Sequence, residues 1–192
     1  MNAPFQPRWT ALRQADLADP NEARRIERFV ADHPQGTAFH RPAWLNAVAR
    51  GTGNRALCLL SERGGAVAGY LPLLEVHSPL FGRVMVSSGF GVGGGIVAET
   101  DGIAAELVGA AEELALRRSV PTIELRGGVL PLDREGWTVR HDSHCGFSAP
   151  LEGDDEAQLT WIPRKQRAEV RKGLAGELTV EMGRGAADRA AH

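Results

Sequence analysis

The sequence predicts an α/β fold in which a mixed, mainly antiparallel central sheet is flanked by helices. Two observations lead to this prediction. The apolar, β-rich runs 56–60 and 66–76 stand on either side of Glu62-Arg63-Gly64-Gly65, and the paired glycines are typical of a hairpin turn. Residues 101–118 instead repeat apolar side chains at helical spacing, namely Ile103, Leu107, Ala111 and Leu114.

The chain before the hairpin is expected to form a strand and two helices. Residues 9–17 read as a short strand, and a helix to about Asp32 follows. Asp19 is its expected N-cap, with Pro20 at the first helical position and Glu22 at capping-box spacing. The expected buried stripe of this helix is Ile26, Phe29 and Val30.

Pro42 begins the second expected helix, whose apolar face is Trp44, Leu45 and Val48. Gly51 is placed to end this helix, because glycine tolerates the left-handed conformation that closes many helices. Arg50 falls in its last turn, where a cation favours the helix dipole and could also face a ligand.

The remaining elements are expected on both sides of the long helix. Strands are predicted at 84–88, 122–125, 137–140, 145–151 and 178–182. Asp154 and Asp155 are expected to cap a further helix that carries Leu159 and Trp161.

Positive charge is concentrated between Trp161 and Gly173. Pro163 suits the first position of a helix, which would bring Arg164, Arg167 and Arg171 onto one face with Lys165 and Lys172 flanking it. Ala168 sits among these cations, and Val170 and Leu174 are left for the core. Guanidinium groups suit phosphate or carboxylate, so the face is a candidate anion site. The alternative is an ordinary solvated helix face.

Three stretches resemble FemAB-related proteins, especially those that accompany exosortase systems. Residues 162–173 resemble the Pro-Arg-Lys-x-Arg-x-x-x-Arg-Lys segment of that family. Residues 78–98 resemble its loop, strand and glycine turn, and residues 39–45 resemble the entry to its second helix. The resemblance covers nearly the whole chain. It implies a GNAT-like fold and transfer of an acyl or aminoacyl group to an amine, in the best-known members from aminoacyl-tRNA to a peptidoglycan precursor.

The same resemblance implies a domain organisation. Residues 1–183 correspond to the first GNAT-like half of a FemAB-type protein, and residues 184–192 to the start of its second half. We therefore expect an incomplete catalytic cycle, a mobile tail, and either self-association or pairing with a separate chain that supplies the second half. The resemblance also gives Arg50 a place near the acceptor.

Glycines 89, 91 and 94 satisfy the dinucleotide pattern Gly-x-Gly-x-x-Gly, but residues 96–98 stay extended where that motif needs a helix. Gly91-Val92-Gly93 also has the spacing of the acetyl-CoA loop of ordinary GNAT enzymes, with Ser88 in the place of the usual Arg or Gln. Two interpretations remain. Gly91, Gly93, Gly94 and Gly95 form either a tight turn or a loop that lets a ligand approach the backbone.

Composition bounds the function more loosely. The 192 residues are 43% hydrophobic with a net charge of −2, which suits a soluble globular chain and excludes a protein that coats nucleic acid generally. With no apolar leader and no run long enough to span a bilayer, a cytoplasmic location is expected. The two cysteines, Cys58 and Cys145, are expected to be reduced thiols there.

Metal and nucleophile sites are not favoured. His141, Asp142, His144 and Cys145 could ligate zinc by residue type, but residues three apart on a strand face opposite ways and no second ligand pair follows. Cys145 is more typical of a small core residue than of an activated thiol. We expect no metal and no cofactor.

The leading hypothesis is FemAB-like aminolysis of an activated ester, with Arg164, Lys165, Arg167, Arg171, Lys172 and Arg50 holding the anionic donor or acceptor. That ligand would be aminoacyl-tRNA or a phosphate-bearing envelope precursor, related to peptidoglycan or exopolysaccharide. No catalytic residue can be named from the sequence. The alternatives are a non-catalytic domain that binds an anion or partner, and an acetyl-CoA-dependent acetyltransferase.

Overall fold

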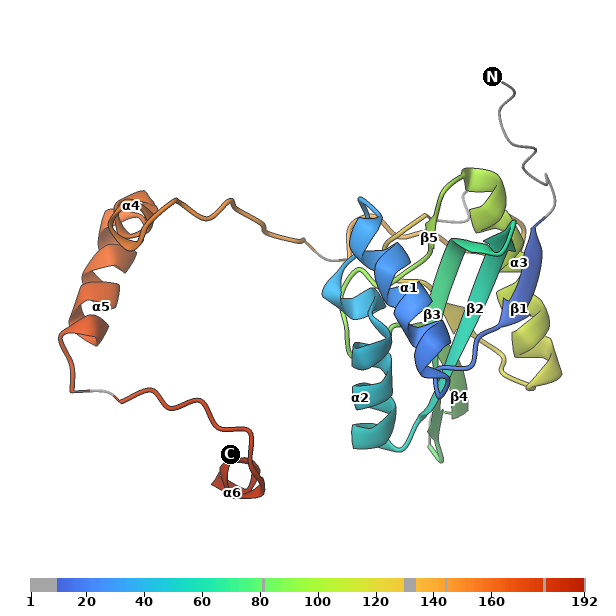
Figure 1. The fold of residues 1–192 in the computed structure, drawn as a ribbon, viewed down its shortest axis with the longest axis horizontal. Coiled ribbons are helices and arrows are strands. Elements are labelled where there is room, and N and C mark those ends of the chain that lie inside the picture. The colour runs from blue at the N-terminus through green and yellow to red at the C-terminus, as the bar shows by residue number, and fades with distance from the viewer. Residues whose placement is uncertain (1–9, 81, 130–133, 144, 178, 192) are drawn as a thin grey trace. The chain divides into compact units, whose positions relative to one another are not determined.

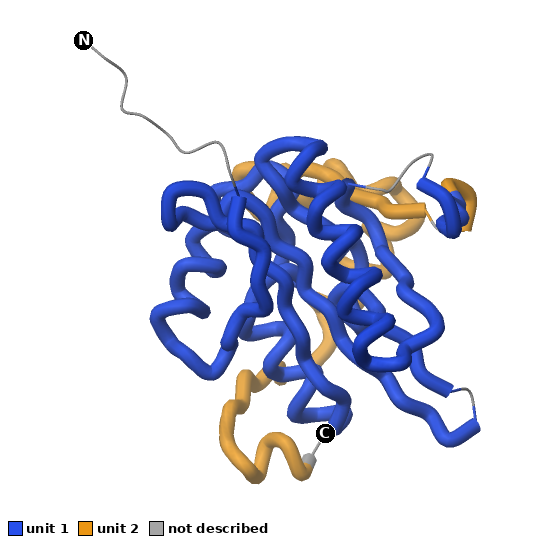
Figure 2. The backbone as a smooth tube through the Cα atoms, turned by 90° about the vertical axis from the view of Figure 1, so that its right-hand side faces the viewer, with its two compact units in different colours: residues 1–140 blue, residues 141–192 orange. Residues whose placement is uncertain are grey.

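The computed structural model describes residues 10–80, 82–129, 134–143, 145–177 and 179–191. The chain divides into two units, residues 1–140 and 141–192 (Figure 2), whose relative placement is not determined. Trp9, Phe81, His144 and Leu178, which belong to the predicted segments, lie outside the described residues.

The first unit is built on a sheet that is mixed and mainly antiparallel (Figure 1). Its described strands follow the spatial order β1-β2-β3-β4-β6, and β5 pairs with β3. Only β4 and β6 run parallel to each other. The strands are β1 (Ala11–Gln14), β2 (Arg55–Arg63), β3 (Ala66–Ser78), β4 (Gly82–Ser87), β5 (Val97–Ala98) and β6 (Ile123–Glu124).

The β2–β3 hairpin closes through a two-residue turn, as predicted. Gly64 and Gly65 have φ values of 59° and 82°, a conformation that glycine adopts without the penalty other residues bear. Arg63 pairs with Ala66 across the turn, and the antiparallel ladder extends to Arg55 and Glu75. A β-bulge between Ser61 and Glu62 shifts this register by one residue, so the turn and the bulge together set which residues of the two longest strands face each side.

Helices cover both faces of this sheet. On one face, α3 (Asp101–Arg117) packs on Leu57, Leu59, Leu71 and Leu73. On the other, α1 (Pro20–Asp32) and α2 (Pro42–Thr52) pack around Cys58, Leu60, Tyr70 and Leu74. The alternation of odd and even positions is the period of two expected of a strand that is buried on both sides. The predicted fold class is confirmed, and the antiparallel strands β2 to β4 precede α3 as the resemblance implies.

The predicted N-cap of α1 is confirmed, but the predicted capping box of α1 and the predicted end of α2 are wrong. The Asp19 carboxylate accepts a hydrogen bond from the Asn21 N–H, so it is the N-cap. Glu22 makes no capping box, because its buried carboxylate is held by the Arg13 guanidinium and the Asp16 N–H instead. Gly51 does not end α2, which runs to Thr52 and closes on Gly53 at a φ of 72°.

The second unit contains α4 (Asp155–Trp161), α5 (Arg164–Leu174) and α6 (Ala186–Ala191). The predicted strands at 137–140, 145–151 and 178–182 are wrong for the described residues, because no partner strand pairs with them. Trp137 is held by its side chain, whose Nε1–H donates to Glu112 of α3 over 2.6 Å. Val170 and Leu174, predicted as core residues, are 39% and 74% exposed. Among the described helices, none has the length and apolar character needed to cross a bilayer.

We expect Leu107→Ala to lower the free energy of unfolding of the first unit by about 2–5 kcal/mol, the range for a buried leucine that leaves a cavity. Leu107 of α3 is fully buried, whereas Leu116 of the same helix is 79% exposed. Leu116→Ala is therefore the matched control, with an expected change within about 0.5 kcal/mol. Urea unfolding measures both. Equal losses would contradict the packing of α3 described above.

Candidate functional site

The glycine segment, residues 88–95, connects β4 to β5 through an unusual backbone. Ser88 and Phe90 have φ values of 42° and 62°, in the left-handed region that residues other than glycine rarely occupy. Gly93 lies there too, at 69°. Residues other than glycine cost about 1–3 kcal/mol each in this region and cluster at functional sites, so Ser88 and Phe90 make the segment a candidate for function.

Most of its glycines are required by close approach of the chain to itself. A Cβ on Gly91 would lie 2.7 Å from the Phe39 ring, and one on Gly94 would overlap the Ser88 side chain. A Cβ on Gly95 would overlap the carbonyl oxygen of Gly127. Only at Gly93, among these four, would a Cβ meet open space. Packing therefore explains Gly91, Gly94 and Gly95, and their role in ligand approach stays a prediction.

The Ser88 side chain is used for contacts within the protein. It is fully buried, and its hydroxyl donates a hydrogen bond to the carbonyl oxygen of Phe39. The position that carries Arg or Gln in an acetyl-CoA loop therefore offers no side-chain donor to a ligand here.

Two histidines tie the segment after β4 to the connection between α1 and α2. His40, at the end of the 3₁₀ turn η1 (Ala38–His40), accepts the Thr37 N–H at Nδ1 over 3.1 Å. Its Nε2 therefore carries the proton and donates to the carbonyl oxygen of Gly95, also at 3.1 Å. Burial lowers the pKa of His40. Sequence reasoning missed this histidine, although its place directly before Arg41-Pro42 could have marked it as part of the helix entry.

His33 makes a similar pair of contacts, and the carbonyl oxygen that it approaches lies three residues after Gly95. Its Nδ1 accepts the Gln35 N–H over 3.1 Å, and its Nε2 lies 3.2 Å from the carbonyl oxygen of Ala98. Two imidazole rings thus contact backbone carbonyls at the end of the glycine segment and in β5, at Gly95 and Ala98.

Arg50 is exposed in the last turn of α2. It lies eight residues beyond the start of that helix, about 12 Å along its axis from the His40 end that contacts the glycine segment. The structure therefore does not bring Arg50 to the glycine segment.

The five predicted cations of the basic segment all lie on α5, in the second unit. Pro163 is the N-cap rather than the first helical residue, so α5 begins at Arg164. Arg164, Lys165, Arg171 and Lys172 are exposed, and within the described parts of the chain none of their side chains has a hydrogen-bond or ion-pair partner. They are free to bind an anion.

Arg167 differs from the other four, because its guanidinium is engaged by the chain. It donates to the carbonyl oxygen of Thr160 over 2.6 Å and to that of Ile162 over 3.0 and 3.2 Å. These oxygens belong to the C-terminal end of α4, where carbonyls lack helical partners and the dipole favours a cation. Arg167 thus fixes the junction between α4 and α5. Sequence spacing placed it on the cationic face but could not show this engagement.

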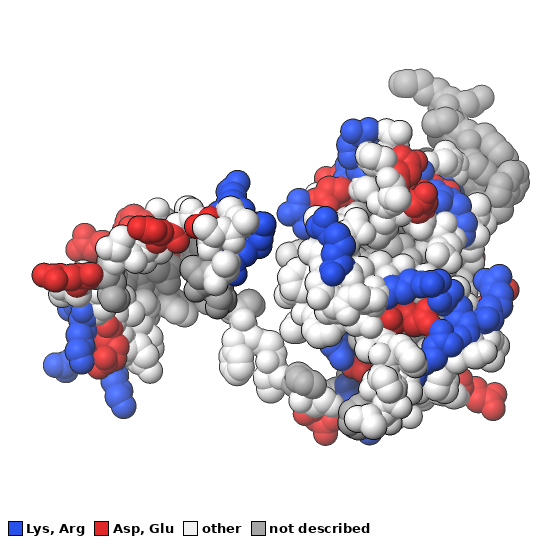
Figure 3. Space-filling model, turned by 90° about the horizontal axis from the view of Figure 1, so that it is seen from below, with Lys and Arg blue, Asp and Glu red and all other residues white. Residues whose placement is uncertain are grey.

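In the first unit, by contrast, many basic side chains stand beside acidic ones (Figure 3). Arg13 and Arg25 share Glu62, and Arg83 and Arg118 share the buried carboxylate of Glu75. The described part of α5 has no such pairing, which makes its charge available.

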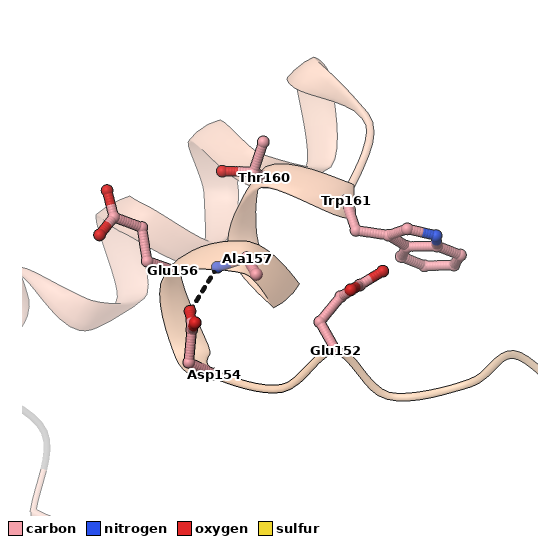
Figure 4. Close-up of a pocket in the computed structure, with 6 residues that line it drawn as sticks. All are labelled: Glu152, Asp154, Glu156, Ala157, Thr160 and Trp161. Carbon is pink, nitrogen blue, oxygen red and sulfur yellow. Dashed lines mark hydrogen bonds between the residues drawn. The ribbon is translucent and has the colours of Figure 1, made fainter.

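A shallow hollow on α4 is lined by acidic side chains, in contrast to the basic surface of α5 (Figure 4). Glu152, Asp154 and Glu156 line it together with Trp161, and the Asp154 carboxylate already accepts the Ala157 N–H over 2.8 Å. Three carboxylates repel a phosphate, so this hollow is not part of the anion site.

The thiol and metal alternatives concern Cys58, Cys145 and the described residues near His141. Burial raises the pKa of the Cys58 thiol to about 12, so it stays protonated at neutral pH. Cys145 is exposed, which makes its prediction as a small core residue wrong. No cluster of three metal-ligating side chains occurs in the described ranges.

Comparisons with known proteins give fold-level likeness alone. No family model and no curated protein matches the chain. A ribosomal-protein-alanine N-acetyltransferase from Brucella melitensis biovar Abortus 2308 is 15% identical, with 92% of this chain and 100% of the other covered and a TM-score of 0.45. A GNAT family acetyltransferase from Staphylococcus aureus subsp. aureus USA300_TCH1516 is 16% identical over 74% of this chain and 98% of the other, with a TM-score of 0.46. A predicted acetyltransferase with acetyl-CoA from Clostridium acetobutylicum is 14% identical over 73% and 96%, also at 0.46. Likeness at this level assigns neither activity nor ligand.

We expect the stability of the first unit to fall between pH 7 and pH 5 because of His40. Its folded-state pKa lies below the unfolded value, so the unfolded chain binds a proton that the folded chain excludes. Stability is therefore complete above the unfolded pKa and decreases as pH falls below it, by at most about 1.4 kcal/mol per pH unit. Urea unfolding of wild type and His40→Gln measures this. The same pH dependence in both proteins would contradict the assignment.

We expect Arg167→Ala to loosen the α4–α5 junction, because the carbonyls of Thr160 and Ile162 lose their donor. The cost is about 1 kcal/mol, the net value of such bonds at a partly exposed site. Amide hydrogen exchange should accelerate in residues 158–171. Arg164→Ala, which removes an unpartnered arginine from the same helix, is the control and should leave exchange unchanged. Protection that survives Arg167→Ala would show that the junction is held by other contacts.

Proposed function

We propose that this chain takes part in FemAB-like N-acyl or aminoacyl transfer to an amine of a cell-envelope precursor, related to peptidoglycan or exopolysaccharide. In this proposal α5 holds the phosphate of the donor or acceptor. The observation that carries it is the set of four exposed cations on α5 whose side chains have no partner among the described residues: Arg164, Lys165, Arg171 and Lys172.

The placement of these cations supports an anionic ligand. Arg164 and Lys165 occupy the first turn of α5, where the positive end of the helix dipole disfavours cations. Pro163 gives no side-chain cap, so the first N–H groups of α5 also lack a side-chain acceptor at the N-cap. A bound phosphate would offset both costs, because it favours the cations and the helix N-terminus alike.

The chemistry of aminolysis makes modest demands on the protein. A neutral amine attacks an activated ester, and the protein must position the reactants, hold the phosphate and stabilise the tetrahedral oxyanion. No covalent nucleophile is needed. This agrees with the state of two groups that could otherwise act as nucleophiles. The Cys58 thiol is buried and protonated, and the Ser88 hydroxyl is hydrogen-bonded to the chain.

Two other functions remain as outcomes of the test. A non-catalytic domain would bind the anion through α5 and release no product. An acetyl-CoA-dependent acetyltransferase is disfavoured for two reasons. Ser88 is buried, and at three of the loop glycines the space beside the Cα atom is already filled by other atoms of the chain.

The test compares the double variant Arg164→Ala/Arg171→Ala with wild type, leaving Arg167 in place. Binding of aminoacyl-tRNA is measured across a salt series, since each phosphate contact contributes to the salt dependence. We expect weaker binding and a slope of log K against log salt that is smaller by about 2. Arg28→Ala/Arg55→Ala removes the same charge from exposed positions of the first unit and should keep the wild-type slope.

Product analysis then separates the three functions. Transfer of the aminoacyl group to an amine acceptor supports the proposal, and binding without product supports the non-catalytic domain. Transfer from acetyl-CoA in preference to aminoacyl-tRNA, or an unchanged salt slope in the double variant, would contradict the proposal.

A further inference from the structure

The four cations of α5 whose side chains have no partner in the described part of the chain share a common centre. We propose that Ala168 is the floor of a single phosphate-sized anion site, ringed by Arg164, Lys165, Arg171 and Lys172. This inference rests on the proposed role of α5 and adds where the anion lies and what size it has.

The geometry of an α-helix carries the proposal. The surface neighbours of any helical residue are those three and four positions away, with Cβ atoms about 5–6 Å apart. For Ala168 these four neighbours are Arg164, Lys165, Arg171 and Lys172. Every adjoining position on that face of the helix is therefore a cation. The ring has one small residue at its centre, and Ala168 is itself exposed.

The state of the side chains agrees with this arrangement. Helical side chains lean toward the N-terminus, so those of Arg171 and Lys172 extend over Ala168. None of the four cations is engaged by another described residue, whereas Arg167, the cation outside the ring, is bound to carbonyls of α4. Glu169, the only acid on α5, lies outside the ring and has no ion pair with a described residue. The engaged cation and the acid are both excluded from the centre.

The ligand class follows from size and charge. The ring spans about 12 Å along the helix axis, which is eight residue steps at 1.5 Å each, and its four cations surround Ala168 on long, flexible side chains. Four cations around one position favour a compact group with more than one negative charge over a single carboxylate. Arginine forks and lysine ammonium groups both bind phosphate oxygens. The site is therefore fitted to a phosphate monoester or a pyrophosphate group.

The test places a competing charge in the ring without removing any cation. In Ala168→Glu the new carboxylate can pair with its four neighbours, so helix content should be kept or increased while anion binding is lost. Gln166→Glu makes the same charge change about 160° around α5, on the opposite face, and is the matched control. Inorganic pyrophosphate is the probe, titrated into the full chain at low salt, and circular dichroism follows helix content.

We expect Ala168→Glu to weaken pyrophosphate binding by at least about tenfold, the effect of one charge-assisted hydrogen bond, and Gln166→Glu to change it less than about twofold. Ala168→Leu, which fills the floor without adding charge, should also weaken binding. Equal loss in Ala168→Glu and Gln166→Glu would overturn the ring, because binding would then depend on net charge alone. So would unchanged binding in Ala168→Glu and Ala168→Leu, or no binding by wild type.

These outcomes are distinguishable from failure of the proposed function. If Arg164→Ala/Arg171→Ala lowers aminoacyl-tRNA binding while Ala168→Glu does not, α5 holds the ligand but not over Ala168. If pyrophosphate binding follows the ring variants and no acyl product forms, the site stands and the transferase assignment falls.

Discussion

The two-glycine turn between β2 and β3 is the constraint on which the rest of the first unit depends. It fixes Arg63 opposite Ala66, and a β-bulge between Ser61 and Glu62 then shifts the register by one residue. Turn and bulge together place Leu71 and Leu73 against α3, and Tyr70 and Leu74 against α1 and α2. A further shift by one residue would exchange the two sets. Both helix layers, and through them the anchoring of the glycine segment, rest on this pairing.

The elements that could be predicted are those whose signal is local. The hairpin, α1 and α3 each carry a turn, a cap or a repeated apolar spacing that needs no distant partner. The failures at 137–140, 145–151 and 178–182 are of another kind. Alternating side chains describe an extended backbone, but a strand exists only if another strand supplies hydrogen bonds, and that depends on residues far away in the sequence. Trp137 reads as a strand residue and is instead held by Glu112.

The same distinction between local signals and distant contacts separates what could and could not be predicted of the candidate site. Helical spacing located all the cations of α5, because the face of a helix follows from position alone. It could not separate Arg167 from the others, since carbonyl acceptors leave no trace in a residue pattern. His40 was missed for a related reason: its partner is a backbone oxygen of Gly95, 55 residues away. Gly91, Gly94 and Gly95 were found, but the contacts that require them come from Phe39, Ser88 and Gly127.

The contact between Gly95 and Gly127 joins two stretches that lie on opposite sides of α3 in the sequence. The carbonyl of Gly127 occupies the place of a side chain at position 95, and the atoms of Ile96 occupy that of a side chain at Gly128. Backbone therefore rests directly on backbone, with Val129 donating to Ile96 over 3.2 Å. Neither stretch can be lengthened, shortened or transplanted alone. For an engineer who grafts the glycine segment onto another scaffold, residues 127 and 128 must travel with it, although they lie more than thirty residues downstream in the printed sequence.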